Sequence, residues 1–370
     1  MRKALKYLFY TLNALALLLL MASAFSDRIS PHEWILPSFL GFLFPFFLSV
    51  NLLFLVVWIF SSGWKAALCN IAFFLMVWGS IRTYCPINPV KEKMPEKTIK
   101  LMTYNVMGFA YKNHTEEEPN PILEYVAGED ADIVCFQEYF VNKKNRFLDQ
   151  PTVSEALKNY PYRKFVYFDN NKFYQYGLAV YSKYPVTGAE RINYESSFNG
   201  SAIFRLEIDG KKVTLINNHL ESNRITSKDK EFYQSLRQGN IGAETLGSLK
   251  DNIVRRLKPA FIQRGRQADA IAQKIKEQDS DYMLVCGDFN DTPISYAHHK
   301  IKGSLKDAFV EHGNGLGISY NADYFWFRLD YILHSPKIKS YRCYVDRSIK
   351  TSDHYPVIAL FSLDGSVSGE

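Results

Sequence analysis

Three long apolar runs at the N-terminal end constrain this chain more than any other feature of its sequence. They cover residues 5–25, 34–60 and 66–81, and the first two carry no charged side chain apart from Lys6. A helix needs about 20 apolar residues to cross roughly 30 Å of hydrocarbon. The sequence therefore predicts a membrane anchor over residues 1–82 with two or three transmembrane helices, depending on whether the short third run spans.

The charges around these runs predict the side of the membrane on which the rest of the chain lies. Arg2, Lys3 and Lys6 favour a cytoplasmic N-terminus, so three crossings place the C-terminal domain on the extracytoplasmic, periplasmic side. The same side follows if the first run is a signal peptide, because "ASA" at 22–24 resembles a cleavage site. In contrast, the basic residues within 82–100 favour the cytoplasmic side for the segment that follows the third run. If the third run does not span the membrane, the C-terminal domain is cytoplasmic.

Beyond residue 82 the composition becomes that of a soluble domain. Residues 83–98 combine prolines with charges, which indicates an exposed linker. From 99 to 370, short apolar runs alternate with turn signals and predict strands. Helical periodicity is clearest from Ala243 to Gln278, with an interruption at Pro259. We expect an α/β domain whose sheets are partly covered on both faces.

The cysteines and the net charge set limits on the function. None of the five cysteines forms a C-x-x-C pair, and Cys69, Cys135 and Cys286 lie inside apolar runs. We predict neither a disulfide framework nor a zinc site. The formal net charge of +6 permits an anionic substrate without requiring one.

Acidic, amide and imidazole side chains stand at the ends of the predicted strands. Asp288 and Asn290 follow the apolar stretch "YMLVCG", and strand alternation would place both on one side, although the same residues also form turns. Asn and Asp commonly end strands, and a lone His is commonly structural. The other strand-end residues are Asn105, Glu138, Asn218, His219, Asp330, Asp353 and His354.

This set of side chains suits the hydrolysis of a phosphate ester. Carboxylate and amide oxygens are ligands for Mg²⁺ or Mn²⁺ and are poor ligands for zinc. One histidine held by an acidic partner can deprotonate or orient water, and a second can donate to the developing charge. A metal would neutralise the phosphoryl group and lower the pKa of bound water.

Seven stretches of the sequence resemble the motifs of the endonuclease/exonuclease/phosphatase superfamily, and they occur in the same order along the chain. They are "LMTYNVMGF", "DIVCFQEYF", "YGLAVYSKYPV", "LINNHLES", "LVCGDFNDTP", "FRLDYILHS" and "TSDHYPVIA", and they cover Ile99 to about Leu363. The resemblance implies a two-sheet α/β sandwich of the deoxyribonuclease I type, with helices on its outer faces and an active site at one rim. It also implies Mg²⁺ or Mn²⁺ as the cofactor.

The resemblance further implies a role for each matching residue. Glu138 would be the principal metal ligand, with Asn105 and Asp353 beside the ion. The residues implied in catalysis are Asp288 and Asn290, which would position the water and the phosphate, His354 as general base or acid oriented by Asp330, and His219, which would hydrogen-bond the scissile phosphate. Outside the motifs, surface positions are expected for His298, His299 and His312, and Arg264 and Arg266 are candidates to reach a phosphate.

We therefore expect a metal-dependent phosphoester hydrolase, acting on a phosphodiester by in-line attack of metal-activated water. Anchoring keeps the domain close to lipid phosphodiesters, so the expected partners are the bilayer and a phospholipid-like or other extracytoplasmic phosphodiester. No obligate protein partner is evident. The Trp-Cys-Asp-Arg run of inositol polyphosphate 5-phosphatases is absent, which argues against that branch. The alternatives are a membrane-tethered nuclease and a non-catalytic phosphate-binding membrane protein.

Overall fold

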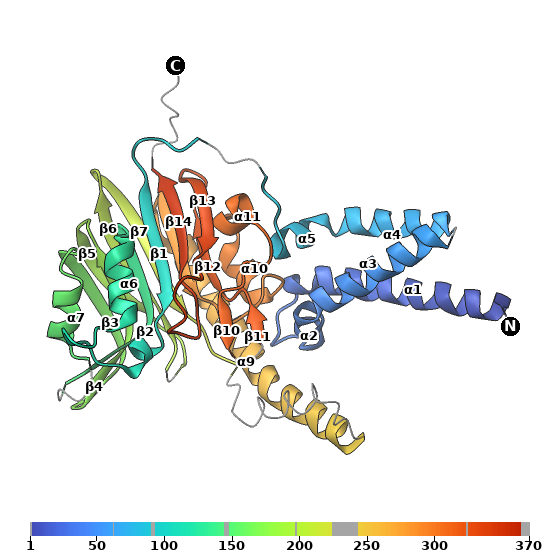
Figure 1. Ribbon diagram of the computed structural model, residues 1–370, viewed down its shortest axis with the longest axis horizontal. Helices are drawn as coiled ribbons and strands as arrows, with labels where there is room; N and C mark the ends of the chain where they lie inside the picture. Colours follow the sequence, from blue (N-terminus) through green and yellow to red (C-terminus); the bar gives the residue numbers. More distant parts are fainter. Residues whose placement is uncertain are drawn as a thin grey trace.

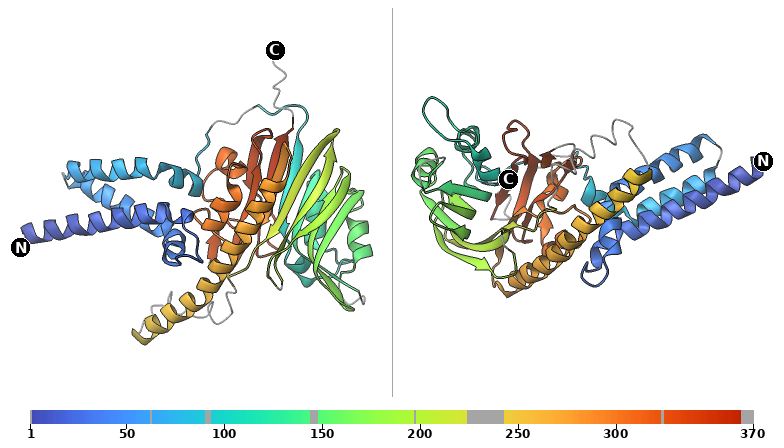
Figure 2. Two further views of the ribbon diagram at one scale, coloured as in Figure 1. Left: turned by 180° about the vertical axis from the view of Figure 1, so that it is seen from behind. Right: turned by 90° about the horizontal axis from the view of Figure 1, so that it is seen from below.

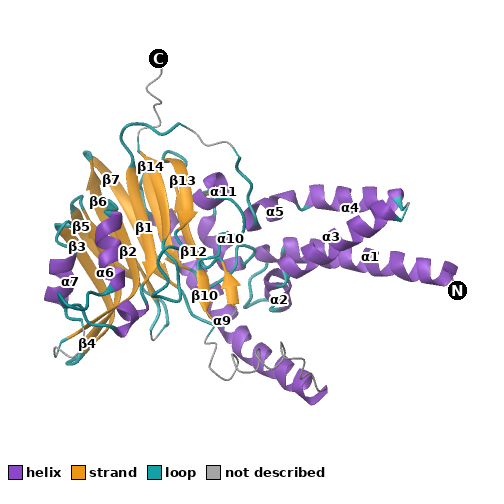
Figure 3. Ribbon diagram, in the orientation of Figure 1, coloured by secondary structure: helices purple, strands orange, loops and turns teal. Residues whose placement is uncertain are grey.

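The computed structural model describes residues 2–61, 63–89, 93–143, 148–196, 198–223, 243–322 and 325–363. A group of N-terminal helices projects from one side of a domain built on two facing β-sheets (Figure 1). Figure 3, coloured by secondary structure, shows the strands of the two sheets with the helices outside them. The predicted two-sheet α/β sandwich is thereby confirmed.

The N-terminal helices follow the apolar runs, but two of the runs are bent. The helices are α1 (Arg2–Ala24), α2 (Leu36–Phe42), α3 (Phe44–Phe60), α4 (Trp64–Met76) and α5 (Trp78–Tyr84). Among the described residues, one helical stretch, Ala4–Arg28, is long and apolar enough to cross a membrane. The chain bends by 58° between α2 and α3 and by 66° between α4 and α5, so the described residues hold one candidate span, or up to three if each bent pair is counted as one.

A small polar cluster joins three of these helices. The side-chain oxygen of Asn13 on α1 accepts hydrogen bonds from Trp58 Nε1 on α3 at 2.8 Å and from Asn70 Nδ2 on α4 at 2.9 Å. All three side chains are buried. In apolar surroundings, such side-chain hydrogen bonds between helices fix which faces meet. We call Asn13, Trp58 and Asn70 the amide cluster.

The first sheet of the sandwich has six strands. In spatial order they are β13 (Lys339–Val345), β14 (Val357–Ser362), β1 (Ile99–Asn105), β2 (Ile133–Asn142), β4 (Tyr174–Ser182) and β3 (Tyr162–Asn170). Strands β1 and β2 are parallel, and the other neighbours are antiparallel. The outer face of this sheet is covered by α6 (Pro121–Glu129) and α7 (Gln150–Ala156).

The second sheet also has six strands. In spatial order they are β5 (Val186–Ile192), β6 (Gly200–Ile208), β7 (Lys211–His219), β8 (Tyr282–Asp288), β12 (Asp330–His334) and β9 (Lys306–Asp307). Its outer face is covered by α9 (Ala243–Glu277) and α10 (Tyr296–Lys302), while α11 (Ala308–His312) follows β9 and a hairpin of β10 (Tyr320–Ala322) and β11 (Phe325–Phe327) lies apart. Helix α9 continues through Pro259, where an interruption was predicted.

The inner faces of the two sheets form the main core of the domain. Its side chains alternate along each strand with those that face the outer helices, as strand geometry requires. Representative members, all buried, are Leu101, Val180, Phe204, Leu284 and Phe361. This core holds the two sheets face to face, and it therefore brings the strand ends of one sheet against those of the other.

The N-terminal helices are packed against the sandwich. The ring centroids of Phe39 on α2 and Phe261 on α9 are 5.3 Å apart, and Ile294 belongs to the same apolar cluster as residues of α1 and α3. Asp27 Oδ2 lies 3.2 Å from His299 Nδ1. Figure 2 shows the helices leaving the domain beside α10 and α9. The N-terminal helices are thus docked on the sandwich as well as tethered to it.

Candidate active site

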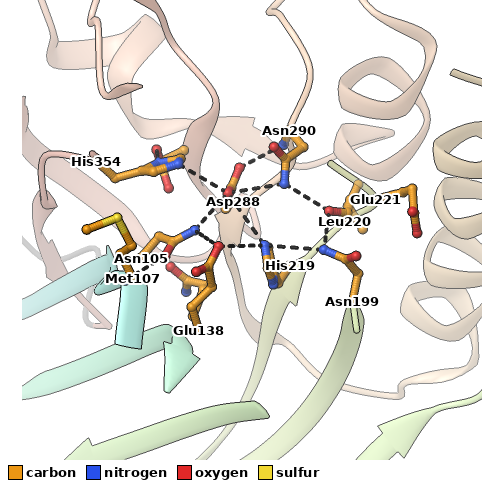
Figure 4. A network of polar contacts seen from close by, with 12 residues as sticks. Asn105, Met107, Glu138, Asn199, His219, Leu220, Glu221, Asp288, Asn290 and His354 are labelled. Carbon is orange, nitrogen blue, oxygen red and sulfur yellow. Dashed lines mark hydrogen bonds and ion pairs between the residues drawn. The ribbon is translucent and has the colours of Figure 1, made fainter. Parts of the chain in front are cut away.

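Two parallel strand pairs deliver polar side chains to one edge of the sandwich. Strand β1 runs parallel to β2, and β7 runs parallel to β8, so their carboxyl ends lie at the same edge. Asn105, His219 and Asp288 are the last residues of β1, β7 and β8. Glu138 comes from β2, and all four side chains point into one space (Figure 4).

A β-bulge aims Glu138 at this space. Between Phe136 and Tyr139 the pairing of β2 with β4 shifts by one residue, and Glu138 has a positive φ of 52°. A bulge bends its strand and redirects a side chain, and positive φ is costly for a residue with a Cβ. Gly177, opposite the bulge on β4, has room for no side chain. The local strain therefore places the carboxylate at the site rather than on the strand's regular face.

Asp288 and Asn290 meet through a turn. The backbone N–H of Asn290 donates to Asp288 Oδ1 at 2.8 Å, its side-chain amide donates to Asp288 Oδ2 at 3.2 Å, and its φ is 53°. The two side chains do lie together, but strand alternation is not the cause, because β8 ends at Asp288. Just before it, Gly287 lies so close to the backbone of Asn218 that a Cβ would clash.

Asp288 lies at the centre of the polar network. Its Oδ2 is 3.1 Å from Asn105 Nδ2, 3.5 Å from His354 Nε2 and 3.9 Å from His219 Nε2. The Asn105 amide also donates to Glu138 Oε1 at 3.1 Å, while its oxygen accepts from the backbone of Met107. Asn105 thus bridges two carboxylates through its nitrogen, and its part in binding a metal stays a prediction.

His354 and Asp330 form a buried acid–imidazole pair. His354 Nδ1 is 2.7 Å from Asp330 Oδ2, and both residues are buried. Asp330 lies directly opposite Asp288 in the pairing of β12 with β8, and its backbone N–H donates to Ser319 Oγ at 3.1 Å. This arrangement fixes the ring so that Nε2 faces Asp288.

The surroundings shift the pKa values of these groups in different directions. Burial raises the pKa of Asp288 to about 6, and burial likewise raises the pKa of Glu138. Burial would lower the pKa of His354, but the carboxylates of Asp330 and Asp288 hold it well above its usual value. Burial lowers the pKa of His219. Within one cluster, pKa values shifted in opposite directions allow one group to accept a proton while another stays charged and donates one.

Asn199 is a member of the site that the sequence did not single out. Its amide nitrogen is 3.3 Å from His219 Nε2 and donates to the carbonyl of Leu220 at 2.9 Å. Asn290 donates to the same carbonyl at 2.9 Å. Because Asn199 stands before β6 in an Asn-Gly pair, its sequence signal is that of an ordinary turn.

The donor set suits a hard divalent cation. Glu138 and Asp288 are carboxylates held 3.1 Å from a shared amide, and Asp353, half-buried, adds a charge that raises the pKa of Glu138. A cation would offset the cost of burying these charges. Asp288, Asp330 and His354 also offer ligand atoms within 4.8 Å of one another. Because His354 and Asp330 already share a short hydrogen bond of 2.7 Å, we interpret them as an acid–imidazole pair.

Arg264 supports the site from behind instead of facing it. This buried side chain on α9 donates to Asp291 Oδ2 at 2.9 Å and to the carbonyl of Glu221 at 2.9 Å. These hydrogen bonds direct the guanidinium of Arg264 to protein groups and not to a phosphate.

His298, expected at the surface, is buried with Nε2 3.2 Å from Asp307 Oδ2. The expectation for His298 was wrong because this pair satisfies the ring in the interior.

Comparisons with known proteins address the family and the fold. The model described as the Endonuclease/Exonuclease/phosphatase family matches residues 102–354, and a domain of unknown function (DUF8431) matches residues 6–84. A search of curated proteins finds no match.

Solved structures share the sandwich. An endonuclease/exonuclease/phosphatase from Beutenbergia cavernae is 16% identical with a TM-score of 0.51, and the alignment covers 73% of this chain and 72% of that chain. The human Nocturnin catalytic domain with bound sulfate is 16% identical with a TM-score of 0.50, over 74% of this chain and 96% of that chain. At these identities the likeness shows the fold alone.

Proposed function

The chain belongs to the endonuclease/exonuclease/phosphatase family, and we propose that it is a metal-dependent phosphodiesterase anchored in the membrane that hydrolyses a phospholipid-like headgroup. The observation that carries this proposal is the meeting of Glu138, His219, Asp288 and His354 around one space, with Asp330 behind His354. Carboxylates beside both a neutral and a charged imidazole are the groups that phosphoester hydrolysis needs.

Glu138, with Asp353 beside it, would hold Mg²⁺ or Mn²⁺, which when bound neutralises phosphoryl charge and lowers the pKa of bound water. Asn105, whose amide nitrogen donates to Glu138 and Asp288, would join as a ligand by turning its oxygen toward the ion. Asp288 and Asn290 hold the attacking water through the carboxylate and the amide that already face each other. With a pKa of about 6, Asp288 accepts a proton from that water near neutral pH.

The leaving group departs as the water adds to phosphorus from the opposite side. The new P–O bond forms, the bond from phosphorus to the alcohol breaks, and the imidazolium of His354 donates a proton to the departing oxygen. Asp330 keeps His354 charged and oriented. His219, neutral because burial lowers its pKa, donates a hydrogen bond from Nε2 to a non-bridging phosphate oxygen.

The docking of the anchor supports a substrate at the membrane. Phe39 packs on Phe261, and Ile294, four residues after Asn290, packs among the N-terminal helices. Contacts on this scale hold the site at a fixed distance from the bilayer, which raises the local concentration of lipid phosphodiesters. We place the domain on the extracytoplasmic side because of the basic residues at the N-terminus.

A membrane-tethered nuclease is the second candidate function, and one groove favours it. Arg255 and Arg256, together with Glu195 and Glu221, line a groove of about 500 Å³ that also includes Ser222, which borders the site. Cationic side chains near a catalytic centre attract the phosphates of a nucleic acid backbone. The substrate panel below separates this candidate from the lipid phosphodiesterase.

The test uses the full chain in nanodiscs, with Mg²⁺, with Mn²⁺ or with EDTA. We expect metal-dependent hydrolysis of bis-p-nitrophenyl phosphate and of phospholipid headgroups, with plasmid DNA left intact. Nicking of plasmid with lipids untouched would make the protein a nuclease. Hydrolysis that survives both EDTA and Glu138→Gln would refute the proposed chemistry, and Glu311→Gln serves as the matched control because this acid also pairs with a histidine.

A further inference from the structure

A cleft of about 320 Å³ opens directly beside Glu138 and His219. A group attached to a phosphate held by these residues would enter it. The wall of the cleft is unusually rich in aromatic side chains for a phosphate site, and this composition bears on which group enters. The aromatic residues are Tyr111, Phe140, Tyr174, Tyr176 and Phe198.

The fold places these rings together for identifiable reasons. Phe140 lies two residues beyond Glu138 on β2 and is directly opposite Tyr176 on β4. The ring of Phe140 lies 5.1 Å from that of Tyr174 and 5.8 Å from that of Tyr111, between centroids. Tyr111 ends a run of positive φ values that begins at Met107. The rings of Tyr111, Phe140 and Tyr174 therefore form one wall of the cleft beside Glu138.

The cleft also carries negative charge. Asp169, half-buried on β3, accepts a hydrogen bond from the Tyr174 hydroxyl at 2.6 Å, and it lines the cleft with the rings. Among the described residues that line the cleft, none is a lysine or an arginine. Aromatic faces and a carboxylate both attract cations, and together they are the usual recognition elements for alkylammonium groups. A second anionic group would be repelled.

We propose that this cleft, the aromatic cleft, binds the alkylammonium group of a phosphodiester substrate such as a phosphocholine or phosphoethanolamine ester. The inference rests on the proposed phosphodiesterase function and specifies its substrate. The ammonium lies against the rings near Asp169 while its phosphate lies between Glu138 and His219. The same chemistry occurs in lipid headgroups and in soluble glycerophosphodiesters, and the experiment separates these two sources.

A nucleobase is the other group that aromatic rings accept. Single-stranded nucleic acids, however, are bound where stacking rings alternate with cations that follow the backbone. Asp169 stands where such a cation would be needed, and Arg255 and Arg256 line a different groove. The charge of the aromatic cleft therefore favours the ammonium ester, and a nucleotide ester serves as the competing probe.

The experiment compares three p-nitrophenyl esters with the full chain in nanodiscs and Mg²⁺: phosphorylcholine, thymidine 5′-phosphate and bis-p-nitrophenyl phosphate. Asp169→Asn should raise KM for the phosphorylcholine ester by about tenfold, with kcat nearly unchanged. The same variant should leave bis-p-nitrophenyl phosphate unaffected, because that ester has no cation. Asp346→Asn is the matched control, since Asp346 accepts from the Tyr125 hydroxyl at 2.7 Å outside the cleft.

Two outcomes would overturn the inference while leaving the phosphodiesterase function intact. One is a preference for the thymidine ester over the phosphorylcholine ester, and the other is an equal effect of Asp169→Asn on all three esters. The rate of hydrolysis of sphingomyelin or phosphatidylcholine in vesicles is then compared with that of glycerophosphocholine. Faster hydrolysis of the vesicle substrates assigns the substrate to the lipids, and faster hydrolysis of glycerophosphocholine assigns it to the soluble esters.

A binding measurement keeps the inference testable if no ester is hydrolysed. Calorimetry with Mg²⁺ should show phosphocholine binding about tenfold more tightly than methyl phosphate, with the difference lost in Asp169→Asn. Equal affinities for the two ligands would refute the ammonium site. Failure of hydrolysis with this preference retained would instead refute the proposed function.

Discussion

Two buried polar clusters in this molecule differ in charge and in how completely they are hydrogen-bonded. The amide cluster of the N-terminal helices joins Asn13, Trp58 and Asn70 through neutral groups, each of which finds a partner in the cluster. The cluster at the rim of the sandwich holds carboxylates and imidazoles. There, Asp330 Oδ1 and His219 Nδ1 are buried with no hydrogen-bond partner among the described residues.

The difference separates a structural role from a chemical one. Neutral amides that satisfy each other contribute modestly to stability and fix the packing of helices. Buried charges cost free energy and shift pKa values, as burial does for Asp288, so their retention indicates a function for which the charges are needed. Removing a member of the first cluster should therefore affect stability, and removing a member of the second should affect turnover.

The largest effect is expected from Asp288→Asn. The amide keeps one of the two hydrogen bonds with Asn290 but cannot accept a proton from water, so kcat should fall by about 10³-fold or more. The free energy of unfolding should change little, because removing a carboxylate whose pKa is raised by burial offsets the acceptor lost by the neighbouring amides. Steady-state kinetics and chemical denaturation measure the two quantities. If kcat fell together with a large loss in the free energy of unfolding, the cluster at the rim would have a structural role, as the amide cluster does.

A smaller effect is expected when the second cluster loses Asn199. Asn199→Ala removes the hydrogen bond to the Leu220 carbonyl and the contact of the amide with His219 Nε2, which should lower kcat by about tenfold. The matched control is Asn314→Ala, because the Asn314 side chain also accepts from and donates to the backbone, here that of Asn88, away from His219. Equal kcat values for the two variants would show that Asn199 does not position the histidine.

The amide cluster should respond in stability alone. Asn13→Leu leaves the donors of Trp58 and Asn70 without their shared acceptor, which should lower the free energy of unfolding in detergent by about 1–2 kcal/mol. The kcat for bis-p-nitrophenyl phosphate should not change. A fall in kcat without any loss of stability would mean that the helices take part in the chemistry.

The smallest effect is expected at the contact between the two regions. Phe39→Leu weakens the edge-to-face contact with Phe261, worth about 1 kcal/mol. We expect about two- to threefold slower hydrolysis of vesicle substrates and an unchanged rate on a soluble ester. Equal slowing on both substrates would mean that docking acts on the catalytic residues rather than on access to the bilayer.

Sequence patterns predicted the fold and most of the residues at the rim. The order of strands and the polar residues at their ends are local features, and the parallel pairing of β1 with β2 and of β7 with β8 brings them to one edge. Asn105, Glu138, His219, Asp288 and His354 could therefore be named before the structure was known.

Features that depend on partners distant in sequence could not be predicted. The direction of Glu138 depends on a bulge opposite Gly177, and the burial of His298 depends on its pairing with Asp307. The two bends in the apolar runs lie next to Phe44 and Val77, which join one buried cluster with Ile294 of the sandwich. Asn199 carried no pattern of its own, because its importance lies only in its distance to His219.

The most direct test of the account compares two histidines that both pair with acids. His354 Nδ1 is 2.7 Å from Asp330, and His334 Nε2 is 2.9 Å from Glu311 outside the site. We measure the Mg²⁺-dependent hydrolysis of bis-p-nitrophenyl phosphate by His354→Gln and His334→Gln in the full chain, with unfolding followed in parallel. The account predicts a loss of about 10³-fold for His354→Gln alone. Similar rates for the two variants would contradict it.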